Sequence, residues 1–239
     1  MHEEIEGLEK KRCVRDIINL DKVPPGATVI DSKFVFKLKC GANGRVTRFK
    51  ARCTGRGDQT HEGFDYQETF APTIRFKTFR TMVATSILLD RPLYGFDFVQ
   101  VYLNGWLDKA IYLRLLKEYT ALNPKYDSKL VKLNQALYGL CQSGRAWYNR
   151  FTEWVTTNGY EQSVSGPCVY FNSDRSSWIA LYVDNGHVLC TNKEVYEQLC
   201  DLVENDFEIK RLGQVEFTLG MNLDWTSDGC TIHQRQHTN

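Results

Sequence analysis

"LYVDNG" (residues 181–186) brings an apolar run to an end on an aspartate and an asparagine. One interpretation is a tight hairpin turn, because Asn-Gly tolerates the positive φ angles that two-residue turns require. The other is a metal ligand, Asp184, at the tip of a strand, with Asn185 where a second carboxylate would stand. The sequence of these six residues leaves both interpretations open.

A second carboxylate lies in a similar setting. The stretch "LYGFDFVQVYLNG" (93–105) reads as a strand that carries Asp97 inside an apolar run. A single such aspartate is often a capped turn residue. Burying a carboxylate is costly unless it is paired or binds a metal. Two of them on separate strands, Asp97 and Asp184, therefore suggest a shared cation.

The cationic residues gather in a predicted hairpin. In "KFVFKLKCGANGRVTRFKARC" (33–53) apolar and basic residues alternate on both sides of a Gly-rich turn, which predicts one apolar face and one basic face. Residues 33–57 hold eight Lys/Arg and no acid, whereas residues 194–228 hold nine Asp/Glu and two Lys/Arg. A solvated sheet face usually mixes both signs. Cations without a partnering acid favour an anion-binding face, toward which a polyanion is drawn.

Composition limits the class of protein. The chain has 239 residues, 42% hydrophobic and 25% charged, which is ordinary for a soluble globular protein. Its longest apolar runs are far shorter than a membrane-spanning helix requires, so we expect no membrane span. None of its eight cysteines forms a C-x-x-C pair and no signal peptide precedes them, so we expect free thiols rather than zinc or disulfides. Free thiols indicate a reducing compartment, so we do not expect a secreted protein.

The remaining patterns predict a mixed α+β fold with strands along the whole chain. Helical spacing covers 75–90 and 145–159, and a further helix is predicted to begin at Thr191 with Glu194 completing a capping box. The stretch "EFTLGMNLDW" (216–225) predicts a strand pair.

At this point the residues match a known family. The chain resembles the reverse transcriptase of copia-type (Ty1-like) retrotransposon polyproteins from about Glu3 to Gln234. The resemblance rests on "PPGATVIDSKFVFKLK", "GRVTRFKARCTGRGDQTHEGFDYQETFAPTIR", "LNGWLDKAIYL", "KLNQALYGLCQSGRAWY", "LYVDNG" and "FEIKRLGQVEFTLGMNL", which follow the family's order and spacing.

The resemblance implies a right-hand polymerase with fingers and palm subdomains and an antiparallel palm sheet packed on helices. It implies one reverse transcriptase domain, 1–239, with 1–92 mostly fingers, 93–127 palm, 128–150 fingers and palm, and 151–239 palm and primer grip. Thumb and RNase H regions are expected to be absent.

It also implies an activity, cofactors and partners. Family members add deoxynucleotides, taken from deoxynucleoside triphosphates with release of pyrophosphate, to a primer on an RNA or DNA template, with two Mg²⁺ ions, or Mn²⁺, positioning the reactants. No membrane partner is expected, and the family works in the cytoplasm in a virus-like particle, or in the nucleus. Oligomeric state is not readable from the sequence.

Residue roles carry over position by position. The catalytic positions are Asp97, Asp184 and Asn185, of which Asp97 and Asp184 would bind metal. The nucleotide-binding positions are Lys50, Arg52, Tyr102, Gln142 and Lys210. The primer grip comprises Phe217, Leu219, Gly220 and Met221. Tyr102 would exclude a 2′ hydroxyl and Lys210 would protonate the leaving pyrophosphate, although Tyr102 also fits a core aromatic.

Departures from the family pattern leave two interpretations open. Val99 and Val101 replace small or polar residues, "LCQSGRAWY" lacks a lysine and a proline of the family motif, and Asn185 replaces the second aspartate of the Tyr-x-Asp-Asp hairpin. The first interpretation is an RNA-directed DNA polymerase impaired by Asn185. The second is a non-catalytic remnant of a retroelement that keeps the fold and binds nucleic acid.

Overall fold

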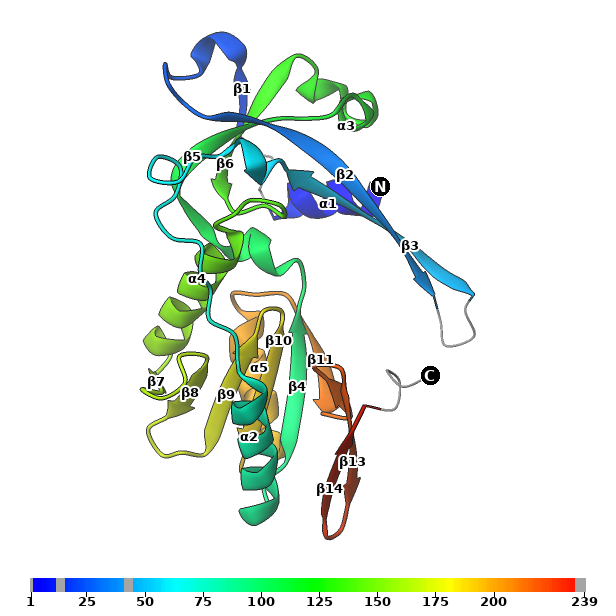
Figure 1. Cartoon of the computed structure of the whole chain (residues 1–239), viewed down its shortest axis with the longest axis vertical. Coiled ribbons are helices and arrows are strands. Elements are labelled where there is room, and N and C mark those ends of the chain that lie inside the picture. Colours follow the sequence, from blue (N-terminus) through cyan, green and yellow to red (C-terminus); the bar gives the residue numbers. More distant parts are fainter. Residues whose placement is uncertain (1, 12–15, 41–44, 235–239) are drawn as a thin grey trace. The chain divides into compact units, whose positions relative to one another are not determined.

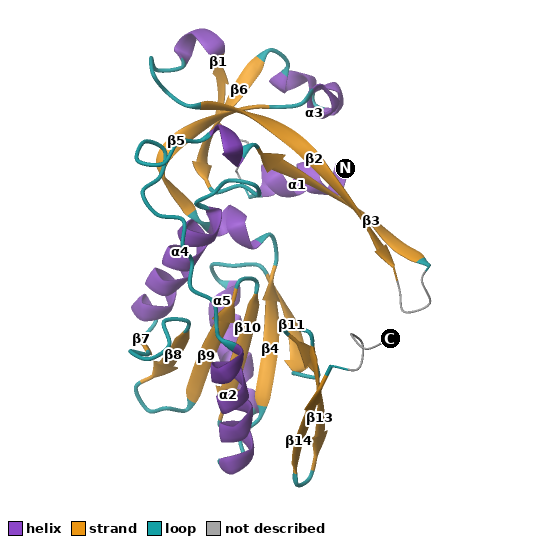
Figure 2. Cartoon of the chain, viewed as in Figure 1, coloured by secondary structure: helices purple, strands orange, loops and turns teal. Residues whose placement is uncertain are grey.

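The computed structural model describes all residues except 1, 12–15, 41–44 and 235–239 (Figure 1). The chain divides into two compact units, each of which mixes helices and strands as the sequence predicts (Figure 2). The first unit comprises Met1–Ala71 and Gln100–Arg150, and the second comprises Pro72–Val99 and Phe151–Asn239. No helix among the described residues has the length and apolar character needed to span a bilayer.

The first unit is built on a five-stranded sheet in the order β1-β6-β5-β2-β3. Neighbouring strands are antiparallel except β2 and β5, which are parallel. Its elements are α1 (His2–Lys10), β1 (Asp16–Asn19), η1 (Leu20–Lys22), β2 (Val29–Cys40), β3 (Val46–Gly55), η2 (Gly57–Gln59), η3 (Val101–Asn104), β5 (Trp106–Arg114), α3 (Lys117–Leu122), η4 (Pro124–Tyr126) and β6 (Lys129–Gln135). Helix α4 (Ser143–Thr157) contains residues of both units.

The core of the first unit forms where α1, β2, β5 and β6 meet. Leu8, Ile30, Leu113 and Val131 from these four elements have no exposed surface. Each buried Leu, Ile or Val side chain contributes on the order of 1.5–3 kcal/mol to folding. This core holds the base of the β2–β3 hairpin in place.

The second unit is built on a six-stranded sheet in the order β11-β4-β10-β9-β8-β7. A separate three-stranded sheet, β12-β13-β14, follows it in the sequence. All neighbouring strands are antiparallel. Its elements are α2 (Phe76–Leu88), β4 (Leu93–Phe98), β7 (Tyr160–Gln162), β8 (Val169–Asn172), β9 (Ser177–Tyr182), β10 (Asn185–Cys190), α5 (Lys193–Glu204), β11 (Ile209–Gln214), β12 (Phe217–Thr218), β13 (Met221–Thr226) and β14 (Gly229–His233).

Helices α2 and α5 cover opposite faces of the six-stranded sheet. Phe79 of α2 packs against the ring of His187 on β10, with centroids 4.9 Å apart. Tyr196 of α5 stacks on Tyr94 of β4 at 4.6 Å. Tyr94 is the register partner of Val188, and side chains alternate between faces along a strand, so His187 and Tyr94 point in opposite directions. Strands β4 and β10 are therefore covered on both faces.

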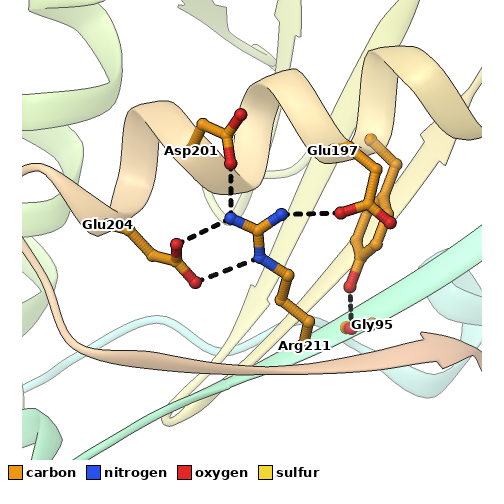
Figure 3. Close-up of polar contacts among 6 residues, drawn as sticks. Gly95, Glu197, Asp201, Glu204 and Arg211 are labelled. Carbon is orange, nitrogen blue, oxygen red and sulfur yellow. Dashed lines mark hydrogen bonds and ion pairs between the residues drawn. The ribbon is translucent and has the colours of Figure 1, made fainter.

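Arg211 ties the edge strand β11 to helix α5 (Figure 3). Its guanidinium contacts Glu197 and Glu204 at 2.6 Å and also Asp201, three acids on one face of the helix. The Arg211 guanidinium lowers the pKa of the Glu204 carboxyl. Because Arg211 follows Lys210 directly, this ion-pair cluster fixes the strand that carries Lys210.

Two local predictions are wrong in detail. The strand predicted over 93–105 ends at Phe98, because Gln100 adopts a left-handed conformation with φ 51° and the 3-10 helix η3 follows. The helix predicted to begin at Thr191 is capped instead by Asn192, whose side-chain oxygen accepts a hydrogen bond from the Val195 N–H at 3.0 Å. Asn is as good an N-cap as Ser or Thr.

Candidate active site

The tip of the β9–β10 hairpin brings Asp184 beside the end of β4. Tyr182 pairs with Asn185 across the hairpin, so Val183 and Asp184 form its turn. The backbone N–H of Phe98 donates a 2.7 Å hydrogen bond to the Asp184 carbonyl. Asp97 and Asp184 therefore lie at the adjoining ends of neighbouring strands, as the shared-cation interpretation requires.

A row of register partners crosses the sheet at this level. Asp97 on β4 pairs with Asn185 on β10 on one side and with Lys210 on β11 on the other. Directly opposite residues of antiparallel strands point to the same face. Asp97 and Asn185 are half-buried, and Lys210 is exposed. The structure thus brings Asp97, Asn185 and Lys210 to one face, next to the Asp184 turn.

The Asn-Gly turn interpretation is wrong. Asn185 and Gly186 are the first two residues of strand β10, and the positive φ of the turn, 54°, falls on Val183. A β-branched residue in the left-handed region is strained. Glycine is needed at 186 for packing, since a Cβ there would lie 2.3 Å from the Phe96 ring.

Asn185 is hydrogen-bonded to the neighbouring carboxylate. Its Nδ2 donates to Asp184 Oδ1 at 2.9 Å. An aspartate at 185 would instead place two like charges side by side, an arrangement that raises a carboxyl pKa unless a cation neutralises it. The amide therefore gives Asp184 a neutral hydrogen-bond partner in place of a second negative charge.

The donor set fits magnesium rather than a softer metal. Within the described part of the chain, no three His, Cys, Asp or Glu side chains gather closely enough to hold a metal ion. Asp97 and Asp184 together offer two carboxylates. Mg²⁺ is typically bound in proteins by one or two carboxylates, with waters and substrate phosphates completing its shell. These two residues would hold it.

The predicted primer-grip residues form the tight β12–β13 hairpin. Leu219 and Gly220 make the turn with φ of 53° and 72°, Met221 is 1% exposed and Phe217 is 55% exposed. Thr218 Oγ1 lies 2.7 Å from Nε2 of the buried His187 on β10. The hairpin is therefore attached to the strand that begins with Asn185.

In the first unit, the predicted basic face is present on the β2–β3 hairpin. Lys37 pairs with Lys50, and Lys39 pairs with Arg48, so these four cations share one face. Burial and the neighbouring Arg52 lower the pKa of Lys50. The apolar face is not all buried, because Phe36, Leu38 and Phe49 are 66%, 55% and 80% exposed.

The expectation that this basic face has no acid nearby is wrong. Glu4 of helix α1 accepts a hydrogen bond from the Cys53 N–H at 3.2 Å and interacts electrostatically with Arg52 and Lys50. Burial raises the pKa of Glu4. The acid comes from a helix far away in the sequence, so a local charge count missed it.

Arg52 and Tyr102 both contact the ring of Tyr138. The Arg52 guanidinium lies 4.8 Å from the centroid of the Tyr138 ring, a cation–π contact. Tyr102 of η3 packs edge-on against the same ring at 5.1 Å. Two of the predicted nucleotide-binding residues are thereby brought together.

Gln142 lies immediately before α4 and is 7% exposed. Its side-chain oxygen has no hydrogen-bond partner among the residues that the structure describes. A buried, unsatisfied amide oxygen is costly. The Gln142 oxygen therefore has unused hydrogen-bond acceptor capacity among the described residues.

A comparison with known protein families shows which family the chain belongs to. The family described as "Reverse transcriptase (RNA-dependent DNA polymerase)" matches residues 15–239. The chain belongs to this reverse transcriptase family. The curated relatives are Pol polyproteins of copia-type retrotransposons, and the chain is a copia-like member.

Two relatives show the extent of the match. The chain is 30% identical over 226 residues to the retrovirus-related Pol polyprotein from transposon TNT 1-94 of Nicotiana tabacum, covering 93% of this chain and 17% of that protein. It is 30% identical to the Transposon Ty1-ER2 Gag-Pol polyprotein of Saccharomyces cerevisiae, covering 76% of this chain and 10% of that protein. The chain thus spans a small part of the length of these relatives.

Among solved structures, apo telomerase from Candida tropicalis, truncated from its C-terminal domain, superposes with a TM-score of 0.48 at 9% identity. The superposition covers 97% of this chain and 59% of that chain. A score at this level assigns neither activity nor partner to the reverse transcriptase domain.

Three residues of this reverse transcriptase domain escaped prediction. The Tyr138 ring packs against Tyr102, and His187 lies within hydrogen-bond distance of Thr218. Both partners are more than 30 positions away in the sequence, so no local pattern indicates these contacts. Val183 carries the strained turn angle. Tyr138 stands inside the quoted "ALYGLCQ" motif, which was the one available signal.

Proposed function

We propose that the chain is the fingers and palm of an RNA-directed DNA polymerase, impaired by Asn185. The first unit is assigned to the fingers and the second to the palm. This assignment follows the two units and departs from the expected bounds, because it moves residues 72–92 from fingers to palm and residues 100–127 from palm to fingers. The proposal is supported above all by the row of Asp97, Asn185 and Lys210 beside the Asp184 turn.

In this function the palm holds the reactive groups. Magnesium bound by Asp97 and Asp184 would stabilise the charge that develops on the transferring phosphoryl group. Lys210, on the same face as Asp97, donates a proton to the leaving pyrophosphate. Phe217, Leu219, Gly220 and Met221 hold the primer end, and the Thr218–His187 hydrogen bond ties them to the catalytic hairpin.

The fingers bind the incoming deoxynucleoside triphosphate. Lys50 and Arg52 hold its phosphates, because charge-assisted hydrogen bonds to phosphate are strong. The Tyr102 ring, braced by Tyr138, excludes a 2′ hydroxyl. Gln142 offers its unsatisfied oxygen to a donor on the nucleotide or template.

A second candidate function is a nucleic-acid-binding remnant without catalysis. It is favoured by the Asn185–Asp184 hydrogen bond, in which a neutral amide stands where a second carboxylate would attract a metal ion. In this case the basic hairpin still binds a template–primer, but no deoxynucleotide is added.

Primer extension separates the two candidates. The unmodified chain is incubated with an RNA template, a labelled DNA primer and deoxynucleotides, with Mg²⁺ or Mn²⁺. Slow extension that disappears in both Asp97→Asn and Asp184→Asn supports the polymerase. Binding of the template–primer with no extension under either metal supports the remnant.

A further inference from the structure

Strand β2 continues well beyond the sheet that holds its base (Figure 1). Strand β5 pairs with it only at Val29–Asp31, whereas β3 pairs with it from Ser32 to Cys40. Among the residues that the structure describes, β2 therefore has a neighbouring strand on one side only from Lys33 onward. A two-stranded ribbon is marginally stable by itself in water, so this free edge is open to a third strand that would stabilise it.

Hydrogen bonds fix which residues of β2 bond to β3. The Arg56 N–H donates to the Asp31 carbonyl at 2.8 Å. These two residues lie opposite each other, one step beyond the Ser32–Gly55 pair. Hydrogen-bonded and non-hydrogen-bonded pairs alternate along an antiparallel ladder. The odd-numbered residues of β2 therefore bond to β3, and the even-numbered residues turn their N–H and C=O groups away from it.

The even-numbered residues from Phe34 onward direct these groups to the free edge. Cys53, which lies opposite Phe34, donates its N–H to the Glu4 carboxylate rather than to β2, as this phase requires. Phe36 and Leu38 follow in the same phase. Their N–H and C=O groups offer an extended peptide the row of partners that an edge strand uses in strand addition.

The side chains on the two faces of this edge differ in character. Phe36 and Leu38 are exposed on the apolar face, and Lys37 and Lys39 are exposed on the opposite, basic face. Directly opposite residues of paired strands point to the same face. An added strand would therefore place every second residue beside exposed apolar side chains and the residues between them beside lysines. Apolar residues that alternate with Asp or Glu match both faces.

A second copy of the same edge is a poor match. Antiparallel pairing of two β2 edges centred on Phe36 places Lys33 of each copy opposite Lys39 of the other. Moving the register by two residues places Lys33 opposite Lys37, or Lys37 opposite itself. Like charges directly opposite each other destabilise a strand pair. The charge pattern therefore selects an acidic strand rather than another copy of this chain.

We propose that the free edge of β2, from Phe34 to Leu38, binds an extended segment of another protein in which apolar residues alternate with Asp or Glu. The segment adds a third strand to the hairpin. Its acids lie beside Lys37 and Lys39, and its apolar residues cover Phe36 and Leu38. This interaction does not depend on the proposed polymerase function.

The test measures binding of a short fluorescein-labelled peptide, in which valine alternates with glutamate, to the full chain by fluorescence anisotropy. We expect binding that weakens as NaCl is added, because salt screens exposed charge pairs. Two control peptides should bind about tenfold more weakly or worse: one with lysine in place of glutamate, and one with the same composition arranged as a valine block and a glutamate block. Equal binding of the alternating and block peptides overturns the proposal.

Two variants at Phe36 separate the backbone from the side chain. Phe36→Ala and Phe36→Pro both remove the ring, but only proline removes the N–H that points to the free edge, a position at which edge strands tolerate proline. Phe36→Pro should bind the valine–glutamate peptide about tenfold more weakly than Phe36→Ala, and equal affinities contradict strand addition.

A lysine pair tests the predicted match of charges. Lys37→Ala with Lys39→Ala should weaken binding of the valine–glutamate peptide and reduce its salt dependence, because the acids of the peptide lose their partners. Lys129→Ala removes an exposed lysine of β6 in the same unit and should change neither. Equal behaviour of the double variant and this control overturns the predicted acidic partner.

Methylated peptides test the unmodified chain, so their result does not depend on how a variant folds. In an extended peptide the valine N–H groups point to one edge and the glutamate N–H groups to the other. N-methylation of one set should abolish binding, and N-methylation of the other should leave it. Loss of binding with both sets, or with neither, overturns the proposal. Self-association of the unmodified chain that Phe36→Ala abolishes in sedimentation would assign the edge to a second copy and overturn it as well.

Discussion

The Asn185 amide donates a 2.9 Å hydrogen bond to the carboxylate of Asp184, its neighbour at the tip of the β9–β10 hairpin. Asn185 also faces Asp97 across the strand pair. One amide thus contacts one predicted metal ligand and is the register partner of the other. A residue in this position sets how much negative charge the site offers a cation.

Gly186→Ala should destabilise the second unit, because the new Cβ would lie 2.3 Å from the Phe96 ring. Overpacking of this kind typically costs about 1–3 kcal/mol. Chemical denaturation measures it. Gly229→Ala is the control, since nothing lies within 4 Å of a Cβ there. Equal stability of the two variants would show that Phe96 moves aside freely.

His187 should make stability depend on pH. Burial lowers its pKa from 6.5 to about 4. The unfolded chain then binds a proton that the folded chain does not, so stability is fully present above pH 6.5 and falls as the pH drops toward 4. The loss over this window is about 3 kcal/mol, at about 1.4 kcal/mol for each pKa unit.

The measurement is the free energy of unfolding of the unmodified chain and of His187→Leu at several pH values. The difference in slope between pH 4 and 6.5 isolates His187 from the carboxylates, which titrate in both proteins. Parallel curves would mean that the pKa of His187 is the same in the folded and unfolded states, which contradicts the prediction.

Lys50→Ala with Arg52→Ala should weaken triphosphate and nucleic-acid binding and flatten its salt dependence. Each cation that contacts a phosphate of a single strand contributes about 0.7 to the salt slope. The control is Lys22→Ala, an exposed lysine of η1. Fluorescence titration in which the double variant and the control behave alike would remove the basic hairpin from the binding surface.

The local parts of this site could be predicted from the sequence, and the long-range parts could not. The alternation in β2 and β3 is a local signal, and the structure confirms the basic face around Lys50. The attachment of Thr218 to His187 joins residues 31 positions apart, and no periodicity reports it. Glu4 of helix α1 contacts Cys53 of the basic hairpin, 49 positions away, and no local pattern reports that contact either.

Turn chemistry misled the prediction at residues 185–186. Asn-Gly is a strong hairpin signal, yet pairing with β4 and β9 places both residues in a strand and moves the turn to Val183. Tertiary pairing here outweighs the local preference, and the strained residue sits beside a predicted metal ligand, which is where backbone strain tends to collect.

Tyr102→Ala should raise the ratio of ribonucleotide to deoxynucleotide incorporation, by about tenfold or more, if the ring excludes a 2′ hydroxyl. The comparison is made in the Asn185→Asp background, where turnover is expected. Tyr102→Phe is the matched control, because it keeps the ring that packs on Tyr138. A ratio that does not change in the Ala variant would make Tyr102 a core aromatic only.

The central claim is that the palm is intact and that Asn185 limits its activity. The direct measurement is the rate of primer extension on an RNA template with Mg²⁺ for the unmodified chain and for Asn185→Asp. A second carboxylate beside Asp184 supplies the charge that the amide lacks, and a metal contribution of several kcal/mol predicts a gain of about a hundredfold. Asn185→Asp with Asp184→Asn should return to the low rate. Equal rates for the unmodified chain and Asn185→Asp, whether robust or absent, would contradict the claim.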